Sequence, residues 1–279
     1  MPNIGFLNGQ FLPLDELRVS GEDRGYQFGD GVYEVIRVYH GTPFSLPDHL
    51  TRLEQSAAAI CLPLPLTLSE LEDKILQGIQ SSGYASGKVY IQITRGVAPR
   101  SHPFPEPIIP TVVMTFREMM PLDERDVSHG VAAITVPDLR WGRCDIKSLN
   151  LLPNVLAKQQ AQEARVFEAI FIRDGQVTEG TSSNVMGVWD HVLRTPALTN
   201  QILEGVTRNQ VLKLARREGI PVQEGPIVAT NLPEAQELFL IGTTIEVLPV
   251  TRLNGKPIAN GEPGPVSQTL LARFRELVG

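Results

Sequence analysis

The residue best suited to covalent chemistry is Lys147, at the junction of two predicted elements. The apolar run before it (130–141) predicts a strand, and the stretch PNVLAKQQAQEAR after it predicts a helix. A lysine amine attacks carbonyl carbons when burial or neighbouring cations lower its pKa. Arg140 and Arg143 are close in the sequence and could supply that charge. Taken alone, the stretch favours a solvated lysine at a strand end.

Three polar stretches after Lys147 could bind an anion. TEGTSSNV (178–185) gathers hydroxyl groups, an acid and an amide around one glycine. LEGVTRNQV (203–211) puts a glycine and Thr207 at the start of a predicted helix, whose N–H groups attract negative charge. The turn GTT (242–244) is a third contributor. Each also has an ordinary interpretation, such as a polar turn or N-capping of the helix by Thr207.

Together these features are the parts that a pyridoxal 5′-phosphate site requires. Lys147 could carry the cofactor, Glu179 could face its ring nitrogen, and the polar stretches could hold its phosphate. Each signal is weak alone. Their coexistence within residues 147–244 favours such a site.

The composition narrows the class of protein. The chain has 279 residues, of which 42% are hydrophobic and 20% charged, as in a globular enzyme rather than a disordered chain. Its net charge of −6 argues against broad nucleic-acid binding. No apolar run reaches membrane-spanning length, and the start lacks the pattern of a secretory leader. We therefore expect a cytoplasmic protein without a membrane partner.

The sequence shows no pattern for metal or disulfide chemistry. The five histidines are scattered, and Cys61 and Cys144 lie far apart without a CxxC partner. The chain has neither a G-x-S-x-G motif nor a phosphate-binding glycine–lysine loop. We expect no metal ion, and neither hydrolase nor kinase chemistry.

Hairpins interspersed with helices predict an α+β fold rather than an alternating parallel one. Asn8-Gly9, His40-Gly41 and Asn254-Gly255 are hairpin signals between apolar runs. Helical periodicity occurs at 47–60, 68–82, 153–165, 206–219 and 265–278. The stretch REMMPLDERD breaks the pattern, so we place a small N-terminal α+β domain at 1–120 and a larger C-terminal domain, with Lys147, at 121–279.

Six motifs in a fixed order carry a resemblance to a known family. They are EDRGYQFGDGVYEV, TRGVAPRSH, RCDIKSLNLLPNVLAKQ, VTEGTSSNV, ILEGVTRNQV and GTTIEVLPV. Over nearly the whole chain, the sequence resembles the fold-type IV pyridoxal-phosphate aminotransferases, and most closely the bacterial D-amino acid group. The resemblance implies a two-domain enzyme that moves an amino group between a D-amino acid (D-Ala or D-Glu type) and 2-oxoglutarate or pyruvate. It also implies a homodimer with shared active sites.

The resemblance also implies roles for individual residues. Lys147 would form a Schiff base with the cofactor and move the proton during catalysis. The other expected cofactor contacts are Arg52, Glu179, Ser182, Ser183, Asn184, Leu203, Gly205, Val206, Thr207 and Thr243. The expected substrate contacts are Tyr33, Arg100 and His102, as a trap for the carboxylate, with Tyr90, Trp141 and Thr244 around the side chain. Without the resemblance, Arg52 and Arg100 would be interpreted as surface cations, and Tyr90 and Trp141 as core aromatics.

Two departures from the family pattern affect the expected substrate range. Gly242 replaces a serine found in close relatives of this group, and Ile245 replaces a small polar residue. Three alternatives remain open. A branched-chain L-amino acid aminotransferase would usually lack the Arg100-x-His102 pair, and an aminodeoxychorismate lyase would release pyruvate without an acceptor. A non-catalytic pyridoxal-phosphate binding protein would not need Lys147.

Overall fold

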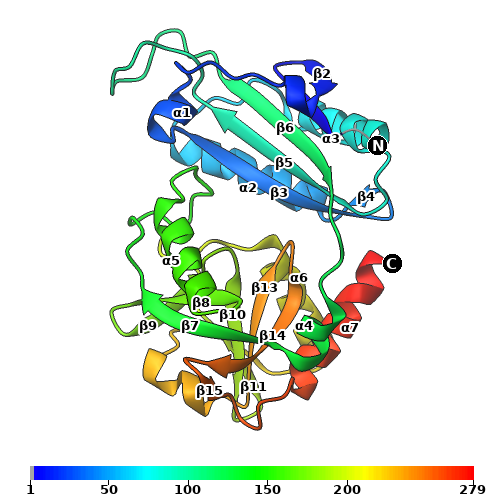
Figure 1. Cartoon of the computed structure of the whole chain (residues 1–279), viewed down its shortest axis with the longest axis vertical. Helices are drawn as coiled ribbons and strands as arrows, with labels where there is room; N and C mark the ends of the chain where they lie inside the picture. The colour runs from blue at the N-terminus through cyan, green and yellow to red at the C-terminus, as the bar shows by residue number, and fades with distance from the viewer. Residues whose placement is uncertain (1–2) are drawn as a thin grey trace. The chain divides into compact units, whose positions relative to one another are not determined.

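The computed structural model describes residues 3–279, and the chain forms two compact units (Figure 1). The first unit comprises the chain up to Pro121 together with Ile146–Asn150. The second comprises Leu122–Asp145 and Leu151–Gly279. Each unit contains a sheet and helices, which confirms the predicted α+β class.

The first unit is built on a six-stranded antiparallel sheet in the order β2-β1-β6-β5-β3-β4. The strands are β1 Ile4–Leu7, β2 Gln10–Pro13, β3 Gly31–Tyr39, β4 Thr42–Pro43, β5 Gly87–Thr94 and β6 Thr111–Glu118. The helices are α1 Arg24–Phe28, α2 Leu46–Ala59 and α3 Leu68–Ser82, with a 3-10 turn at Leu14–Glu16. The hairpin turns predicted at Asn8-Gly9 and His40-Gly41 are confirmed, with all four residues at positive φ.

Helices α2 and α3 pack on one face of this sheet (Figure 1). Alternate residues of the strands point to this face, as the period of a strand requires. They form one buried core with Leu50 and Leu53 of α2 and with Leu71 and Ile75 of α3. A capping box at Thr67 fixes the start of α3.

Lys147 belongs to the first unit, whereas the sequence placed it in the second domain. The short segment that carries it lies beside β3, where Ser148 forms an antiparallel bridge with Val32. The Lys147 carbonyl accepts a hydrogen bond from Tyr33 N (3.0 Å), and Lys147 N donates to Ser56 Oγ of α2 (3.2 Å). The unit to which this lysine belongs is therefore set by backbone pairing with β3 and not by its position in the sequence.

The second unit contains a nine-stranded mixed sheet in the order β12-β11-β10-β13-β14-β7-β8-β9, with β15 paired to β14. The strands are β7 Val131–Pro137, β8 Glu168–Arg173, β9 Gln176–Gly180, β10 Asn184–Trp189, β11 Val192–Thr195, β12 Val222–Glu224, β13 Glu237–Gly242, β14 Glu246–Leu253 and β15 Lys256–Pro257. The helices are α4 Glu124–His129, α5 Leu152–Glu163, α6 Val206–Arg217 and α7 Pro265–Val278, with a 3-10 helix at Ala229–Glu234. Helix α5 connects the parallel strands β7 and β8, as a crossover must.

Helix α6 starts differently from the prediction. Its N-cap is Gly205, which offers no side chain, and Thr207 lies one residue inside the helix and is buried. N-capping by Thr207 is therefore wrong. The first N–H groups of α6 lack a capping side chain at the N-cap position.

No helix within residues 3–279 combines the length and the apolar character needed to cross a membrane.

Gly31 allows the Lys147 segment to approach β3, and this can be tested. A Cβ at residue 31 would lie 2.6 Å from the Ile93 carbonyl oxygen and 2.9 Å from Leu149 Cδ1. We expect Gly31→Ala to lower the free energy of unfolding by about 1–3 kcal/mol, the usual cost of overpacking. Urea unfolding measures this. Gly142→Ala is the matched control, because no atom lies within 4 Å of its added Cβ; equal losses in both variants would contradict the expectation.

Candidate active site

Lys147 lies among aromatic side chains of the first unit. Its half-buried side chain places Nζ 4.4 Å from the centroid of the Tyr33 ring. Tyr33 stacks on Tyr90 with ring centroids 5.7 Å apart, and the Tyr90 hydroxyl donates to Gln92 Oε1 (2.6 Å). Burial, with Tyr33 nearby, raises the pKa of Tyr90 to about 12, so its hydroxyl keeps its proton at neutral pH. Three of the predicted site residues are thus brought together.

Arg52 lies on the inner face of α2 and is bound to a buried carboxylate. Its Nε donates to Glu34 Oε1 (2.6 Å) and its Nη2 donates to Glu34 Oε2 (2.8 Å). Burial opposes ionisation of Glu34, but the Arg52 guanidinium outweighs it and lowers the pKa of Glu34 to about 2. This parallel pairing fixes the plane of the guanidinium. The interpretation of Arg52 as a surface cation is wrong, since the residue is buried.

His49 completes this buried cluster. Burial lowers the pKa of His49, with Arg52 and Lys147 acting in the same direction, so the imidazole is neutral at neutral pH. Its Nδ1 lies 2.8 Å from Glu34 Oε2 and donates to it, because an ionised carboxylate only accepts. Nε2 is then an acceptor, buried and without a hydrogen-bond partner among residues 3–279.

The sequence analysis missed Glu34 and His49 as site residues, although one signal was available. Val32, Glu34 and Ile36 are spaced two residues apart along β3, so their side chains lie on the same, apolar face. All three are fully buried. An acid in the middle of an apolar face predicts a buried partner of opposite charge.

Arg100 and His102 lie in an exposed loop of the first unit and meet at one aromatic ring. The Arg100 guanidinium lies 4.4 Å from the centroid of Phe28, and its Nη1 donates to the Gln27 carbonyl (3.1 Å). The His102 ring centroid is 5.5 Å from that of Phe28. The structure thus groups Arg100 with His102 at the end of α1.

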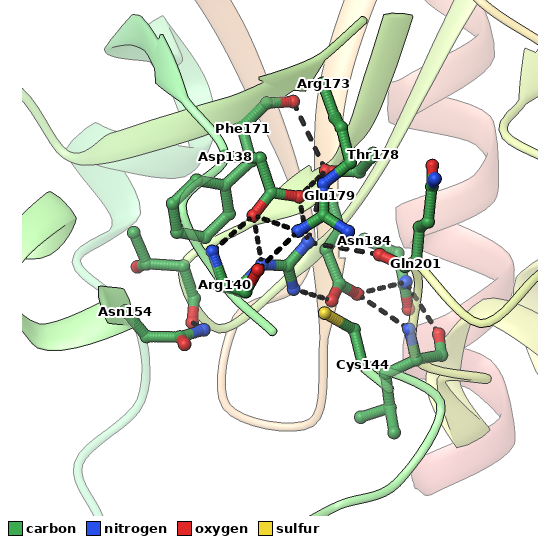
Figure 2. A network of polar contacts seen from close by, with 12 residues as sticks. Asp138, Arg140, Cys144, Asn154, Phe171, Arg173, Thr178, Glu179, Asn184 and Gln201 are labelled. Atoms are coloured by element: carbon green, nitrogen blue, oxygen red, sulfur yellow. Dashed lines mark hydrogen bonds and ion pairs between the residues drawn. The ribbon is translucent and has the colours of Figure 1, made fainter. Parts of the chain in front are cut away.

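Glu179 of the second unit is held by a buried arginine, as Figure 2 shows. Arg140 Nη1 donates to Glu179 Oε1. Arg140 is itself fixed by Asp138, which accepts from Nε (2.9 Å) and Nη2 (2.8 Å). Burial disfavours the charged form of Arg140, but Asp138 and Glu179 outweigh it and raise the pKa of Arg140 further. A permanent positive charge therefore lies against the Glu179 carboxylate.

The two arginines before Lys147 are therefore engaged by carboxylates rather than acting as unpaired cations. Arg140 binds Asp138 and Glu179, and Arg143 pairs with Asp145 near the surface (2.9 Å). The neighbouring Trp141 is 43% exposed, so it is not a core aromatic residue.

The other oxygen of Glu179 connects three predicted site residues. Glu179 Oε2 accepts from Asn184 Nδ2 (3.3 Å) and from Leu203 N (3.1 Å). Asn184 Nδ2 also donates to the Leu203 carbonyl (3.0 Å). A Cβ at Gly205 would lie 2.1 Å from Asn184 Oδ1, so only glycine allows this approach at the start of α6. Val206 and Thr207 follow directly, both buried.

The two adjacent serines of the TEGTSSNV stretch face different surroundings. Ser182 is exposed, whereas Ser183 is buried and its hydroxyl donates to Glu168 Oε2 (3.0 Å). Glu168 also accepts from Thr181, whose carbonyl accepts from Asn154 Nδ2 (2.8 Å). Glu168 therefore fixes this loop by accepting hydrogen bonds from two of its hydroxyl groups, a role that the sequence analysis did not predict.

The GTT turn lies beside the same loop. The Ile245 N–H donates to the Gly242 carbonyl (3.1 Å), which closes the turn. A Cβ at Gly242 would lie 3.5 Å from the Ser182 carbonyl oxygen and 3.2 Å from Ile245 Cγ1. Thr243 and Thr244 are half-buried within the turn.

The buried Glu34 predicts a dependence of stability on pH. Its pKa is about 2 in the folded protein and 4.5 without neighbours. A lowered pKa gives stability that is present above pH 4.5 and is lost as the pH falls toward 2. The difference between these two pKa values corresponds to about 3 kcal/mol of folding stability.

We expect Glu34→Gln to lower the free energy of unfolding at pH 6 by about 3–5 kcal/mol, because Arg52 loses its buried partner. The free energies of unfolding of the variant and of the unmutated protein should differ by about 3 kcal/mol less at pH 2 than at pH 6. Urea unfolding across this range measures it, with the exposed Glu54→Gln as control. A difference that stays constant with pH would contradict the assignment.

Known proteins are similar to this chain in sequence and in fold. A model of the amino-transferase class IV family matches residues 31–253. D-alanine aminotransferase of Bacillus licheniformis is 47% identical over 264 residues, covering 94% of this chain and 93% of that protein. The enzyme of the same description from Listeria monocytogenes serotype 1/2a (strain 10403S) is 44% identical over 273 residues, covering 97% and 94%.

Solved structures of aminotransferases have a similar fold. The branched-chain amino acid aminotransferase of Escherichia coli has a TM-score of 0.93 at 25% identity and covers 100% of this chain and 95% of its own. A branched-chain enzyme from T.th., solved with pyridoxamine 5′-phosphate, has a TM-score of 0.91 at 30% identity and covers 100% and 94%. These matches confirm the resemblance seen in the sequence and the α+β fold. The chain belongs to the class IV aminotransferases.

Proposed function

We propose that this chain moves an amino group between a D-amino acid, of the D-Ala or D-Glu type, and a 2-oxo acid, with pyridoxal 5′-phosphate as cofactor. The observation that carries the reaction type is the Glu179 carboxylate, which Arg140, Asn184 and Leu203 hold in place. The preference for D-amino acids rests on D-alanine aminotransferases that are 41–47% identical over nearly the whole chain.

The described residues suit this cofactor in charge and in shape. At Gly205 a side chain would meet Asn184, which leaves the first N–H groups of α6 open to a phosphate. Val206, Thr207 and Thr243 would add donors there. Ser182 is the exposed serine of its loop, so it suits a contact with the cofactor better than the buried Ser183. Arg52, with its plane fixed by Glu34, would contribute a cation.

Bound pyridoxal 5′-phosphate supplies an electron sink for the substrate Cα–H bond. Lys147 would carry the cofactor through its amine and then transfer the proton at the substrate Cα. Its backbone is held at both N–H and carbonyl, so the side chain alone would have to move between the cofactor and the substrate. Glu179 would hold a proton at the cofactor's ring nitrogen, because Arg140 keeps an opposite charge beside the carboxylate.

Arg100 and His102 would bind the substrate carboxylate. A guanidinium can donate two parallel hydrogen bonds to a carboxylate, and a ring N–H of the histidine can add a third. Tyr33, Tyr90, Trp141 and Thr244 would surround the rest of the substrate. This arrangement favours the D-amino acid reaction over that of a branched-chain L-aminotransferase, whose solved structures match this fold at lower identity.

A homodimer is the assembly that we propose. Tyr26, Val97, Phe104 and Ile109 are large apolar residues of the first unit that are 51–82% exposed. Backbone bridges join Asp23 to Val97 and Gly96 to Ile109, so the chain segments that carry Val97 and Ile109 lie side by side, next to the start of α1. An exposed apolar patch of this kind marks an interface, and a second copy of the chain is the occupant that the family resemblance implies. A cytoplasmic location stays an expectation from the sequence.

The reaction can be tested in a single half-reaction. Mixing the cofactor-loaded protein with D-Ala, without an acceptor, should bleach the absorbance of the bound cofactor quickly, whereas L-Leu should act slowly. We expect Lys147→Ala to lower the bleaching rate by about a thousand-fold or more, because the proton transfer loses its base. Faster bleaching by L-Leu would instead point to the branched-chain group. Pyruvate release without an acceptor would point to the lyase.

The carboxylate trap has its own test. Arg100→Ala should lower kcat/KM for D-Ala by about a hundred-fold, the effect of losing charge-assisted hydrogen bonds worth about 3 kcal/mol. Arg18→Ala, an exposed arginine elsewhere in the first unit, serves as control. An unchanged kcat/KM in Arg100→Ala would remove Arg100 from the trap while leaving Lys147 and Glu179 in their roles.

A further inference from the structure

One buried arginine holds the backbone on which the proposed trap residues lie. Arg24, only 3% exposed, opens α1 and directs its guanidinium at three successive carbonyl groups. Its Nη1 donates to the carbonyls of Ser101 and Pro103, and its Nη2 donates to that of His102 (3.2 Å). All three residues are exposed, so their side chains are not anchored in the core. Arg24 therefore restrains this loop through its backbone.

A second buried arginine fixes the far end of the loop. Arg95, 1% exposed, lies 3.6 Å from the centroid of the Phe104 ring. Its two terminal nitrogens donate to the carbonyls of Ile60 and Cys61 (2.8 and 2.9 Å), so it cannot move without losing its hydrogen bonds to the residues that follow α2.

Asp30 couples the two arginines. Arg24 Nε donates to Asp30 Oδ2 (2.8 Å), and Arg95 Nε donates to both carboxylate oxygens (2.9 and 3.1 Å). Two buried cations thus share one carboxylate, and the carbonyl oxygens supply the remaining negative partial charge. Each guanidinium is planar and donates its hydrogen bonds in fixed directions, so it sets the positions of its partners as well as neutralising charge. An ammonium group is a point charge and would not set these directions.

The side chains of Arg100 and His102 are oriented from the same helix. Phe28, four residues after Arg24, lies 4.9 Å from the Arg24 guanidinium and 4.4 Å from that of Arg100. The His102 ring is 5.5 Å away. Helix α1 therefore restrains the loop backbone through its first residue and the two side chains through its last.

We propose that Arg24, Asp30 and Arg95 are positioning residues that set the affinity for the substrate carboxylate by fixing the Arg100-x-His102 loop, an inference that rests on the function proposed above. None of the three needs to contact the substrate. Their effect is to place the loop before the substrate arrives, so that binding does not have to order it.

The experiment compares Arg24→Gln with Arg37→Gln in the cofactor-loaded protein. Arg37 is a buried arginine of the same unit that donates to Ser86 Oγ and the Met119 carbonyl, away from the loop. The probes are propionate, a carboxylate with no amine to react, and D-Ala. The Kd of propionate is measured by calorimetry, KM and kcat for D-Ala by turnover, and the order of residues 99–105 by hydrogen exchange.

Arg24→Gln should raise the Kd of propionate and the KM of D-Ala by about ten-fold or more, since a small misplacement of binding groups is costly. It should speed hydrogen exchange at 99–105, while kcat and the cofactor affinity change by less than about three-fold. Arg37→Gln should leave the propionate Kd within about two-fold. Arg24→Lys, which keeps a charge beside Asp30, should show a smaller rise in the same direction and replaces Arg24→Gln if that variant does not fold.

A propionate Kd in Arg24→Gln within about two-fold of the unmutated protein would overturn the positioning role, as would equal losses in Arg24→Gln and Arg37→Gln. If the unmutated protein fails to transaminate D-Ala, the proposed function fails instead. Hydrogen exchange then still decides the role of the cluster, because unchanged exchange at 99–105 in Arg24→Gln contradicts it whatever the activity.

Discussion

The bidentate pair of Arg52 with Glu34 is the interaction on which the proposed site in the first unit depends. Both groups are buried, and neither charge would be tolerated there alone. The pair brings α2 onto β3 at the point where the Lys147 segment bridges the same strand and donates to Ser56 of the same helix. A lysine outside any regular element thereby acquires a fixed backbone.

The same solution recurs in the second unit and in the loop of the first. Arg140 is held by Asp138 and in turn holds Glu179, while Arg24 and Arg95 share Asp30. In each case a planar guanidinium connects a carboxylate to a group whose position matters for the proposed reaction. Compared with an apolar pair of the same volume, a buried ion pair contributes little net stability, but it imposes direction. We therefore interpret the buried arginines as groups that orient the residues proposed to bind the substrate and the cofactor.

Much of the fold could be predicted from the sequence, because its signals are local. Asn8-Gly9 and His40-Gly41 form the turns that their residue types require, and the five longer helices occur where apolar residues recur with helical spacing. The short helices α1 and α4 were not predicted, because one or two turns are too few to show a period. The start of α6 was misassigned because threonine is a common cap, whereas the close approach of Asn184 demands glycine at residue 205. The unit to which Lys147 belongs could not be predicted, since backbone pairing with β3 is a long-range contact. Arg24 was missed for a related reason, because a charge at a helix start is ordinary until its distant partner is known. Glu34 was missed although its place on the apolar face of β3 indicated a buried partner.

Gly242 and Ile245, the two positions at which the sequence analysis expects a departure from the family pattern, lie against each other in the GTT turn. A side chain at residue 242 would place its Cβ 3.2 Å from Ile245 Cγ1, tighter than an ordinary contact. A side chain at residue 242 therefore requires Ile245 to shift by a few tenths of an ångström, so glycine at 242 and isoleucine at 245 fit each other. The backbone hydrogen bond from the Ile245 N–H to the Gly242 carbonyl closes the turn and does not depend on either side chain. The two positions are therefore coupled through packing, and a serine introduced at 242 is accommodated best together with a smaller residue at 245.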